Sequence, residues 1–267
     1  MYKIALITAS IGNPDKPELI LTPECEKEFK EYGVDVFRFN DKNVHLLQEH
    51  FIPIIPKEQI YQDTFFLKLR YWIRHFLFNM QSEYPKKEDK YKRLVAKIPR
   101  MLFFRIIPND YDYYIWCDSK FTLEKGWLGS ILKLIEENSD KDVFSYAHSE
   151  RNSIQEEFDY MRYHMRKRNP SLSLLARYNI SDMDNQIYLY KKNKKFIDDS
   201  LYETGIMIYS KKLFTKTDFL DQWYANNYYL TIQDQLSFPF LLALNKINIY
   251  KINQSIFDSG FTKYNYY

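Results

Sequence analysis

The sequence of 267 residues lacks the features of a disulfide-stabilised or membrane-spanning protein. Its two cysteines, Cys25 and Cys117, are too few for a disulfide framework and do not have the spacing of a metal site. No stretch approaches the roughly 18 apolar residues that a spanning helix needs. The apolar run at 1–9 is too short for a signal peptide. We therefore expect reduced thiols and a cytoplasmic protein whose contact with the inner face of the membrane, where it occurs, is peripheral.

Two glycine motifs that bind nucleotide phosphates are also absent. Neither Gly-x-Gly-x-x-Gly nor Gly-x-x-x-x-Gly-Lys-Ser/Thr occurs, which disfavours a Rossmann dehydrogenase and a P-loop enzyme. The formal net charge of +3 is too small for a dedicated nucleic-acid binder, which would carry a strongly basic face. Two runs, 86–93 and 162–168, mix basic and aromatic residues. They either lie on solvated helix faces or contact an anionic membrane surface.

Hydrophobic residues make up 45% of the chain, enough to bury a core, and their spacing predicts alternating strands and helices. Strands are predicted at 3–9, 34–39, 113–117, 142–147, 205–209 and 247–250. Helices are predicted at 64–80, 87–97 (ended by Pro99), 127–137, 154–168, 213–229 and 233–244. This alternation favours a mainly parallel α/β sheet with helices on both faces. No linker or repeat is visible, so we expect one domain, 1–267. The polar segment 171–199 is interpreted as an insertion or an acceptor-side loop that sets acceptor specificity.

Charged side chains stand at two places that could hold a diphosphate. Asp118 directly follows the strand 113–117, and ligands collect at the carboxyl ends of strands in α/β sheets. A carboxylate there suits a Mg²⁺ or Mn²⁺ ion bridging two phosphates, although an ordinary surface turn has the same pattern. Arg93 and Lys97, four residues apart, share one helical face. They either neutralise a diphosphate or form a solvated basic face.

Two further positions carry groups suited to sugar chemistry. His148 and Arg151 follow the strand 142–147; the histidine could bind a metal or a hydroxyl, and the arginine an anion, while a lone histidine is often a structural hydrogen-bonding group. Glu203 precedes a strand and Asp234 begins a helix, so the two carboxylates could converge. One would then deprotonate or orient an acceptor hydroxyl while the other binds sugar hydroxyls. Alternatively, Asp234 only offsets the helix dipole.

Five motifs, in this order, resemble those of a glycosyltransferase-like family once described as a domain of unknown function. They are Arg93-x-x-x-Lys97-Ile-x-x-x-x-Phe103, Tyr111-Asp-x-x-Ile115-Trp116-x-Asp118, His148-x-x-Arg151-x-x-x-x-Glu156, Glu203-x-Gly205 and Asp234-Gln-x-Ser-Phe238. The family includes plant proteins linked to mucilage and pectin synthesis and bacterial proteins from polysaccharide loci. The resemblance covers residues 90–245, and the order of the motifs is more specific than any one of them.

The resemblance implies a GT-A type fold with Rossmann-like binding of a nucleotide-sugar donor, and a Mn or Mg ion held by an Asp-x-Asp motif. In this sequence the motif reads Asp118-Ser119-Lys120, with lysine in place of the second acid. Either Asp118 and His148 share the metal, or Lys120 replaces part of its charge. The implied catalytic residues are Asp234 and Glu203. The implied substrate- and nucleotide-binding residues are Arg93, Lys97, Asp118, Lys120, His148, Arg151 and Gln235.

The function implied is transfer of a sugar from the donor to a glycan or glycolipid acceptor in surface polysaccharide synthesis. Asp118, Arg93 and Lys97 would stabilise the negative charge that develops on the departing diphosphate. A different interpretation follows from Lys120. Because the acid pair is broken, the chain could instead be a catalytically silent nucleotide-sugar-binding module that partners another transferase.

Overall fold

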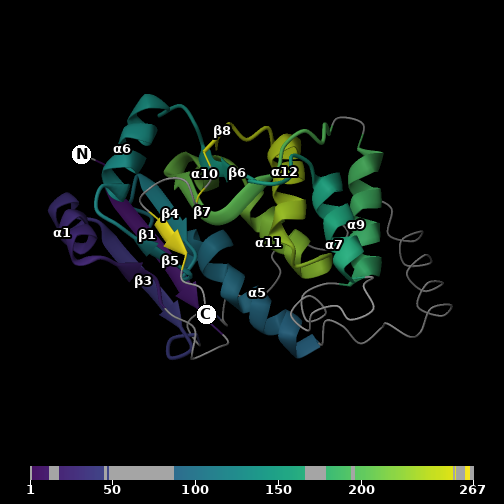
Figure 1. Ribbon diagram of the computed structural model, residues 1–267, viewed down its shortest axis with the longest axis horizontal. Helices are drawn as coiled ribbons and strands as arrows, with labels where there is room; N and C mark the ends of the chain where they lie inside the picture. Colours follow the sequence, from purple (N-terminus) through teal and green to yellow (C-terminus); the bar gives the residue numbers. More distant parts are fainter. Residues whose placement is uncertain are drawn as a thin grey trace.

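A computed structural model (Figure 1) describes residues 2–11, 18–44, 47, 87–165, 179–193, 196–254, 256 and 262–264. The helix predicted at 64–80 lies outside these residues. Among the described helices, none combines the length and the apolar character needed to cross a membrane. Cys25 and Cys117 are both buried free thiols, and desolvation by burial, together with Glu28 and Glu26, raises the pKa of Cys25 to about 12.

The central sheet has six strands in the order β3-β1-β4-β7-β6-β8. They are β1 (Ile4–Ser10), β3 (Asp35–Asn40), β4 (Tyr113–Cys117), β6 (Val143–Ala147), β7 (Tyr202–Ser210) and β8 (Ile249–Ile252). β1 pairs in parallel with β3 and β4, and β6 pairs in parallel with β8. β7 is antiparallel to both of its neighbours, β4 and β6. The predicted α/β architecture, a mainly parallel sheet flanked by helices, is confirmed.

A second, smaller sheet joins β2 (Ile20–Leu21), β5 (Phe121–Leu123) and β9 (Thr262–Tyr264). β5 begins immediately after the turn that contains Asp118, and the Phe121 N–H donates to the Asp118 carbonyl oxygen at 3.2 Å. Because β5 is paired on both sides, the turn from Asp118 to Lys120 is fixed between two sheets.

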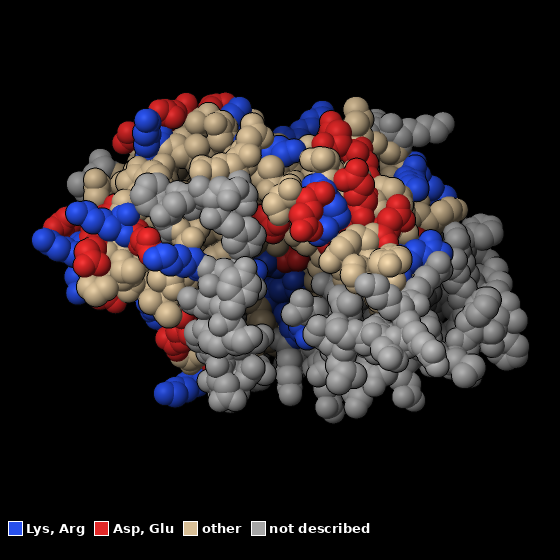
Figure 2. All heavy atoms as spheres, in the orientation of Figure 1, with Lys and Arg blue, Asp and Glu red and all other residues tan. Residues whose placement is uncertain are grey.

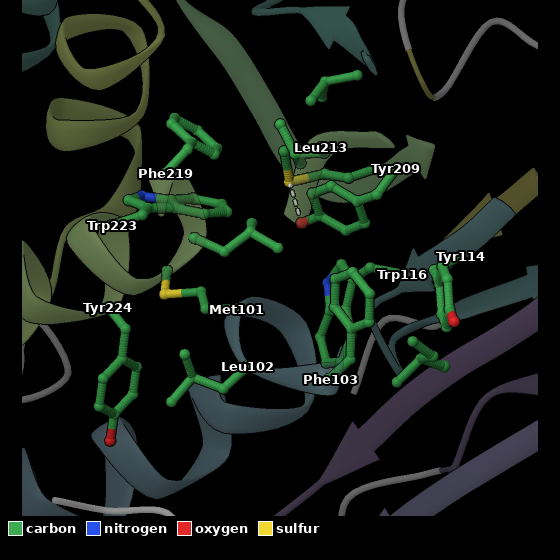
Figure 3. Close-up of a cluster of buried hydrophobic side chains, with 14 of the residues drawn as sticks. Met101, Leu102, Phe103, Tyr114, Trp116, Tyr209, Leu213, Phe219, Trp223 and Tyr224 are labelled. Atoms are coloured by element: carbon green, nitrogen blue, oxygen red, sulfur yellow. Dashed lines mark hydrogen bonds between the residues drawn. The ribbon is translucent and has the colours of Figure 1, made fainter. Parts of the chain in front are cut away.

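The helices cover both faces of the central sheet (Figure 1). They are α1 (Pro23–Tyr32), α5 (Lys87–Met101), α6 (Trp127–Glu137), α7 (Ile154–Met165), α9 (Ile180–Lys192), α10 (Lys211–Lys216), α11 (Phe219–Tyr229) and α12 (Asp234–Asn245), with a 3-10 turn η1 at Phe103–Arg105. Successive residues of a strand point to opposite faces, so each face of the sheet has its own core. One core packs against α1 and α6. The other packs against α5, η1, α11 and α12, and Figure 3 shows its sheet residues Trp116 and Tyr209 beside Met101, Phe103 and Trp223.

Two predicted helices have different bounds in the structure. α5 does not end at Pro99 but continues to Met101. A proline in the last turn removes only its own N–H bond, and the helical pattern resumes when Leu102 N–H donates to the Ile98 oxygen at 2.7 Å. The helix predicted at 213–229 is two helices, α10 and α11. They separate because Thr217 is extended and its hydroxyl donates to the Leu213 oxygen at 2.7 Å.

The segment 171–199 contains a helix that was not predicted. In its described part, α9 packs against α7, and Met183, Ile187 and Tyr190 are buried in a third core with residues of α7. These residues recur at a spacing of four and three, as on one face of a helix. The interpretation as an irregular insertion is therefore wrong for 180–192, whereas a role in acceptor specificity stays a prediction.

Candidate active site

The reversed direction of β7 brings distant residues to one edge of the sheet. β4 and β6 end at this edge, and β7 begins there because it runs the opposite way. The Asp118 N–H donates to the Gly205 oxygen at 2.8 Å, and the His148 N–H donates to the Leu201 oxygen at 3.0 Å. Asp118 and His148 therefore flank the first residues of β7, which include Glu203.

A first group of side chains, here named the Asp234 cluster, consists of Lys97, Arg100, Thr204 and Asp234. The Asp234 carboxylate forms ion pairs with Lys97, at 3.1 Å, and with Arg100. It also accepts a hydrogen bond from the Thr204 hydroxyl at 3.3 Å. The side chains of Lys97, Arg100 and Asp234 are only 14%, 7% and 11% exposed. The cluster joins α5, β7 and α12, and it confirms that Lys97 and Asp234 lie together.

Arg100 is the member of this cluster that was not predicted from the sequence. Its guanidinium carbon lies 5.8 Å from the Trp116 ring and 5.4 Å from the Trp223 ring. Its Nη1 also donates to the Thr204 carbonyl oxygen at 3.3 Å. Desolvation by burial lowers the pKa of Arg100, and the charge of Asp118 opposes that effect. Arg100 is thus a buried cation placed between two carboxylates and two indole rings.

Asp118 and Lys120 extend the charged group toward solvent. Oδ2 of Asp118 is 3.2 Å from the Lys120 ammonium, and the two side chains are 27% and 40% exposed. Oδ1 accepts a hydrogen bond from the Trp116 indole N–H at 2.9 Å. Together with the Asp234 cluster, this gives three cations and two carboxylates, and hence one net positive charge. Figure 2 shows Lys and Arg side chains set back at the centre of one face, near α5, with acidic side chains beside them.

Gly205 is required by the close packing at Asp118. A Cβ atom on Gly205 would lie 3.0 Å from Cε2 of Phe121, 3.3 Å from its Cζ and 3.4 Å from Oδ2 of Asp118. The glycine of the predicted Glu203-x-Gly205 motif therefore leaves room for the ring of β5 and for the carboxylate.

We expect Gly205→Ala to lower the free energy of unfolding by about 1–3 kcal/mol, because a methyl group is forced into a filled space. Urea denaturation followed by tryptophan fluorescence would measure this. Gly129→Ala is the matched control: its Cβ would meet Glu28 Oε1 at an ordinary 3.5 Å, and alanine is favoured inside a helix such as α6. Equal stability of Gly205→Ala and the unmodified protein would contradict the packing argument.

A second group of side chains forms a closed polar ring next to the Asp234 cluster. The polar ring consists of His148, Arg151, Glu157, Gln233, Gln235 and Glu203. Arg151 Nη2 is 3.0 Å from His148 Nε2, and Arg151 Nε donates to Glu157 at 2.6 Å. Gln233 donates to Glu157 at 2.7 Å and to Gln235 at 2.8 Å. Gln235 donates to Glu203 Oε2 at 3.5 Å, and Glu203 Oε1 is 3.6 Å from His148 Nε2.

The polar ring holds two acids in different environments. Glu157 is 2% exposed and is bound by Arg151 and Gln233. Burial lowers the pKa of Arg151, but the charges of Glu157 and Glu150 outweigh this effect and raise it above its usual value. The side chain of Glu203 is 21% exposed, and its two oxygens have only long contacts. Glu203 is therefore the acid of the polar ring that a ligand can reach.

The geometry of His148 and Asp118 does not fit the predicted metal site. His148 Nδ1 accepts hydrogen bonds from the N–H groups of Glu150 and Arg151 at 3.1 and 3.2 Å, and Nε2 lies 3.0 Å from the Arg151 guanidinium. Both ring nitrogens thus already face N–H donors, and a metal ion at Nε2 would also be repelled by the Arg151 cation. Asp118 already contacts the Trp116 indole and the Lys120 ammonium. In the part of the chain that the structure describes, no group of three His, Cys, Asp or Glu side chains could hold a metal ion.

The remaining predicted residues divide between the two groups. Gln235 and Arg151 belong to the polar ring. Arg93 lies one turn before Lys97 on α5, is half-buried, and is outside both groups as defined above. In the basic run 162–168, Arg162 is 3.8 Å from Asp184 of α9, and residues 166–168 lie outside the described residues. Gln233 and Thr204 were not predicted, because neutral amides and hydroxyls give no charge pattern to follow. Glu157 was not predicted as a site residue, because an acid in the first turn of a helix also suits the helix dipole.

Comparison with known proteins identifies a family. Residues 82–263, more than half of the chain, match the family model described as "TOD1/MUCI70, glycosyltransferase-like domain". Comparison with curated protein sequences finds no match.

Several solved structures resemble the chain at very low identity. Mouse xyloside xylosyltransferase 1, in its apo form, has a TM-score of 0.43 and 9% identity, covering 94% of this chain and 84% of that one. The bifunctional glycosyltransferase WbbM has a TM-score of 0.45 and 10% identity, over 94% of this chain and 39% of that one. Core-mannan synthase A from Aspergillus fumigatus, in a Mn/GDP form, has a TM-score of 0.42 and 9% identity, over 94% and 73%.

Proposed function

The chain belongs to the TOD1/MUCI70 glycosyltransferase-like family, and from this premise we propose that it transfers a sugar from a nucleoside-diphosphate donor to a glycan or glycolipid acceptor. Family membership establishes the class of enzyme, a glycosyltransferase. The kind of donor, the kind of acceptor and the part that the reaction plays in surface polysaccharide synthesis belong to the proposal. So do the cytoplasmic location, the peripheral membrane contact and the single domain, 1–267, which stay predictions.

The observation that carries the proposal is the net positive charge of the Asp234 cluster with Asp118 and Lys120. A diphosphate leaving group gains negative charge as its bond to the sugar breaks. Lysine and arginine donors that are already fixed in place stabilise such charge without reorganising. Asp234, being almost buried and paired with two cations, suits the role of an anchor that fixes Lys97 and Arg100.

Glu203 suits the role of the catalytic acid-base group. In the proposed reaction, an acceptor hydroxyl oxygen forms a bond to the anomeric carbon, and the bond from that carbon to the diphosphate oxygen breaks. The electron pair of the broken bond stays with the diphosphate, and the hydroxyl proton passes to the Glu203 carboxylate. Asp118 and Gln235 would contact sugar hydroxyls, and the amide of Gln235 also holds Glu203 in place.

The Mn²⁺ or Mg²⁺ ion implied by the resemblance takes no part in this proposal, because the Lys120 ammonium beside Asp118 and the Arg151 guanidinium beside His148 would repel it. One observation favours a second function. Lys120 contacts Asp118 at 3.2 Å where an acid pair was expected, which also fits a catalytically silent nucleotide-sugar-binding module.

We expect a nucleoside diphosphate to stabilise the protein against heat, since a ligand that binds only the folded state raises its stability. At about 100 times its Kd, such a ligand adds about 2.7 kcal/mol. A thermal-shift screen of UDP, GDP, ADP and CDP would find it, with the four nucleoside monophosphates as matched controls. A chain that responds to none of the diphosphates would contradict both functions. For a nucleotide that binds, release of free sugar from its donors distinguishes the enzyme from the silent binder.

A further inference from the structure

Lys120 occupies the position in which a metal-binding motif would have its second acid. Its ammonium lies 3.2 Å from Oδ2 of Asp118 and 5.3 Å from the centroid of the Phe121 ring. Asp118 and Phe121 are both anchored, the first to β7 and the second in β5. The ammonium is therefore held at one place at the edge of the sheet while 40% of the side chain remains exposed to an incoming ligand.

The cations near Asp118 differ in depth. Arg100 is the innermost, 6% exposed as a residue, and it is covered by Trp116 and Trp223. Lys97, one turn before Arg100 on α5, contacts the Asp234 carboxylate to which Arg100 also binds, and its side chain is more exposed. Lys120 is the most exposed of the three. Asp118, whose charge acts on Arg100 and which contacts Lys120, connects the inner cation to the outer one.

We propose that Lys120, acting with Lys97 and Arg100, binds the diphosphate of the donor in place of a divalent metal ion. This inference rests on the proposed function and adds to it a metal-independent way of stabilising the leaving group. The ammonium groups of Lys120 and Lys97 donate hydrogen bonds to phosphate oxygens, as lysines do in phosphate sites generally. The buried Arg100 contributes through its charge. As the sugar–oxygen bond breaks, its electron pair stays on the diphosphate, and Lys120 keeps its proton.

The chemistry of the donor set supports this assignment. A divalent cation at Asp118 would stand beside the Lys120 ammonium and would be repelled by it. It would also have to share the Asp118 carboxylate with the Trp116 indole N–H, which donates to Oδ1. His148 cannot complete the site, because its Nδ1 is bound by two backbone N–H groups and its Nε2 lies 3.0 Å from the Arg151 guanidinium. The Lys120 ammonium disfavours a metal ion at this place and favours an anion, because its side chain is more exposed than the carboxylates of Asp118 and Asp234.

The test is calorimetric titration of the full chain with UDP and GDP, in EDTA and in Mn²⁺. The Kd of the nucleotide that binds is expected to agree between EDTA and Mn²⁺ within about twofold. Lys120→Ala should weaken that Kd by about tenfold to a hundredfold, the loss of one or two charge-assisted hydrogen bonds. Lys133→Ala, at an exposed lysine of α6, is the matched control and should leave the Kd unchanged.

A reversal of the charge at this position makes the sharper test. Lys120→Asp restores an acid pair, so it should abolish binding in EDTA and make whatever binding remains depend on Mn²⁺. Circular dichroism would show that each variant is folded. Binding of the unmodified chain only in Mn²⁺, or metal-free binding by Lys120→Asp equal to that of the unmodified chain, would overturn the inference while leaving the proposed function in place. A chain that binds neither UDP nor GDP under both conditions, and that no other diphosphate of the thermal-shift screen stabilises, would overturn the two together.

Discussion

Replacing Asp234 by alanine should lower the free energy of unfolding by about 3–5 kcal/mol, because removal of one partner leaves a buried charge without compensation. The charge in question is Arg100, enclosed by Trp116 and Trp223, with Lys97 as a second cation on the same carboxylate. Urea denaturation followed by tryptophan fluorescence would measure the loss. A loss of activity in Asp234→Ala can therefore be assigned to catalysis only after the variant has been shown to be folded.

A double variant separates the ion pair from other effects of the substitution. Arg100→Met combined with Asp234→Ala removes both charges, and we expect the pair to cost less than the sum of the two single changes by about 1–3 kcal/mol. Glu137→Ala, which removes one partner of the exposed pair with Lys133, is the matched control and should cost about 0.5 kcal/mol or less. Additive losses in the double variant would show that Asp234 and Arg100 do not stabilise each other.

Replacing Glu203 by glutamine should lower the rate of sugar release from the donor by about 10²–10⁴-fold, the usual contribution of a general base. Glutamine has nearly the shape of glutamate, and its side-chain oxygen can take the place of the Glu203 oxygen that lies 3.6 Å from His148 Nε2, so the polar ring should persist. The expected result is thus a loss of kcat with unchanged stability. Initial rates with the donor of whichever nucleotide binds, together with the thermal unfolding temperature, would show both.

Glu150→Gln provides the control for this variant. Glu150 contacts Arg151 at 2.8 Å, and its side chain is 69% exposed, so it lies beside the polar ring without belonging to it. Its rate should stay within about threefold of the unmodified protein, since exposed ion pairs contribute little. Full activity of Glu203→Gln would remove Glu203 from the reaction. Tight nucleotide binding without sugar release by the unmodified chain would favour the silent binding module.

The strands were the part of the fold that the sequence predicted best. The strand 113–117 is buried at every position in the structure, so an uninterrupted apolar run identified it. α1 was missed although its boundaries carry clear signals: Thr22 caps it, Pro23 begins it and Gly33, at φ 66°, ends it. Only two of its residues, Cys25 and Phe29, are buried, so its apolar face is short. Boundary residues would have identified this helix where periodicity did not.

In the site, some residues could be found from local sequence signals, whereas others depend on contacts between distant parts of the chain. The ends of strands located Asp118, His148 and Glu203 correctly, because the edge of a sheet follows from strand order. The role of Arg100 depends on contacts with α11 and α12, more than 100 residues away in the chain, and on a helix that continues past Pro99. The contacts of His148 Nδ1 depend on two backbone N–H groups of the following loop. Neither of these contacts can be derived from residue types alone.

The start of β7 links the two halves of the proposed reaction mechanically. Glu203 belongs to the polar ring and Thr204, the next residue, belongs to the Asp234 cluster. Consecutive residues of a strand are separated by only about 3.3 Å along its axis. A loop movement cannot change that spacing, since it is set by one peptide unit inside a paired strand. The backbone of β7 thus keeps the residue through which it joins the polar ring and the residue through which it joins the Asp234 cluster at a constant separation.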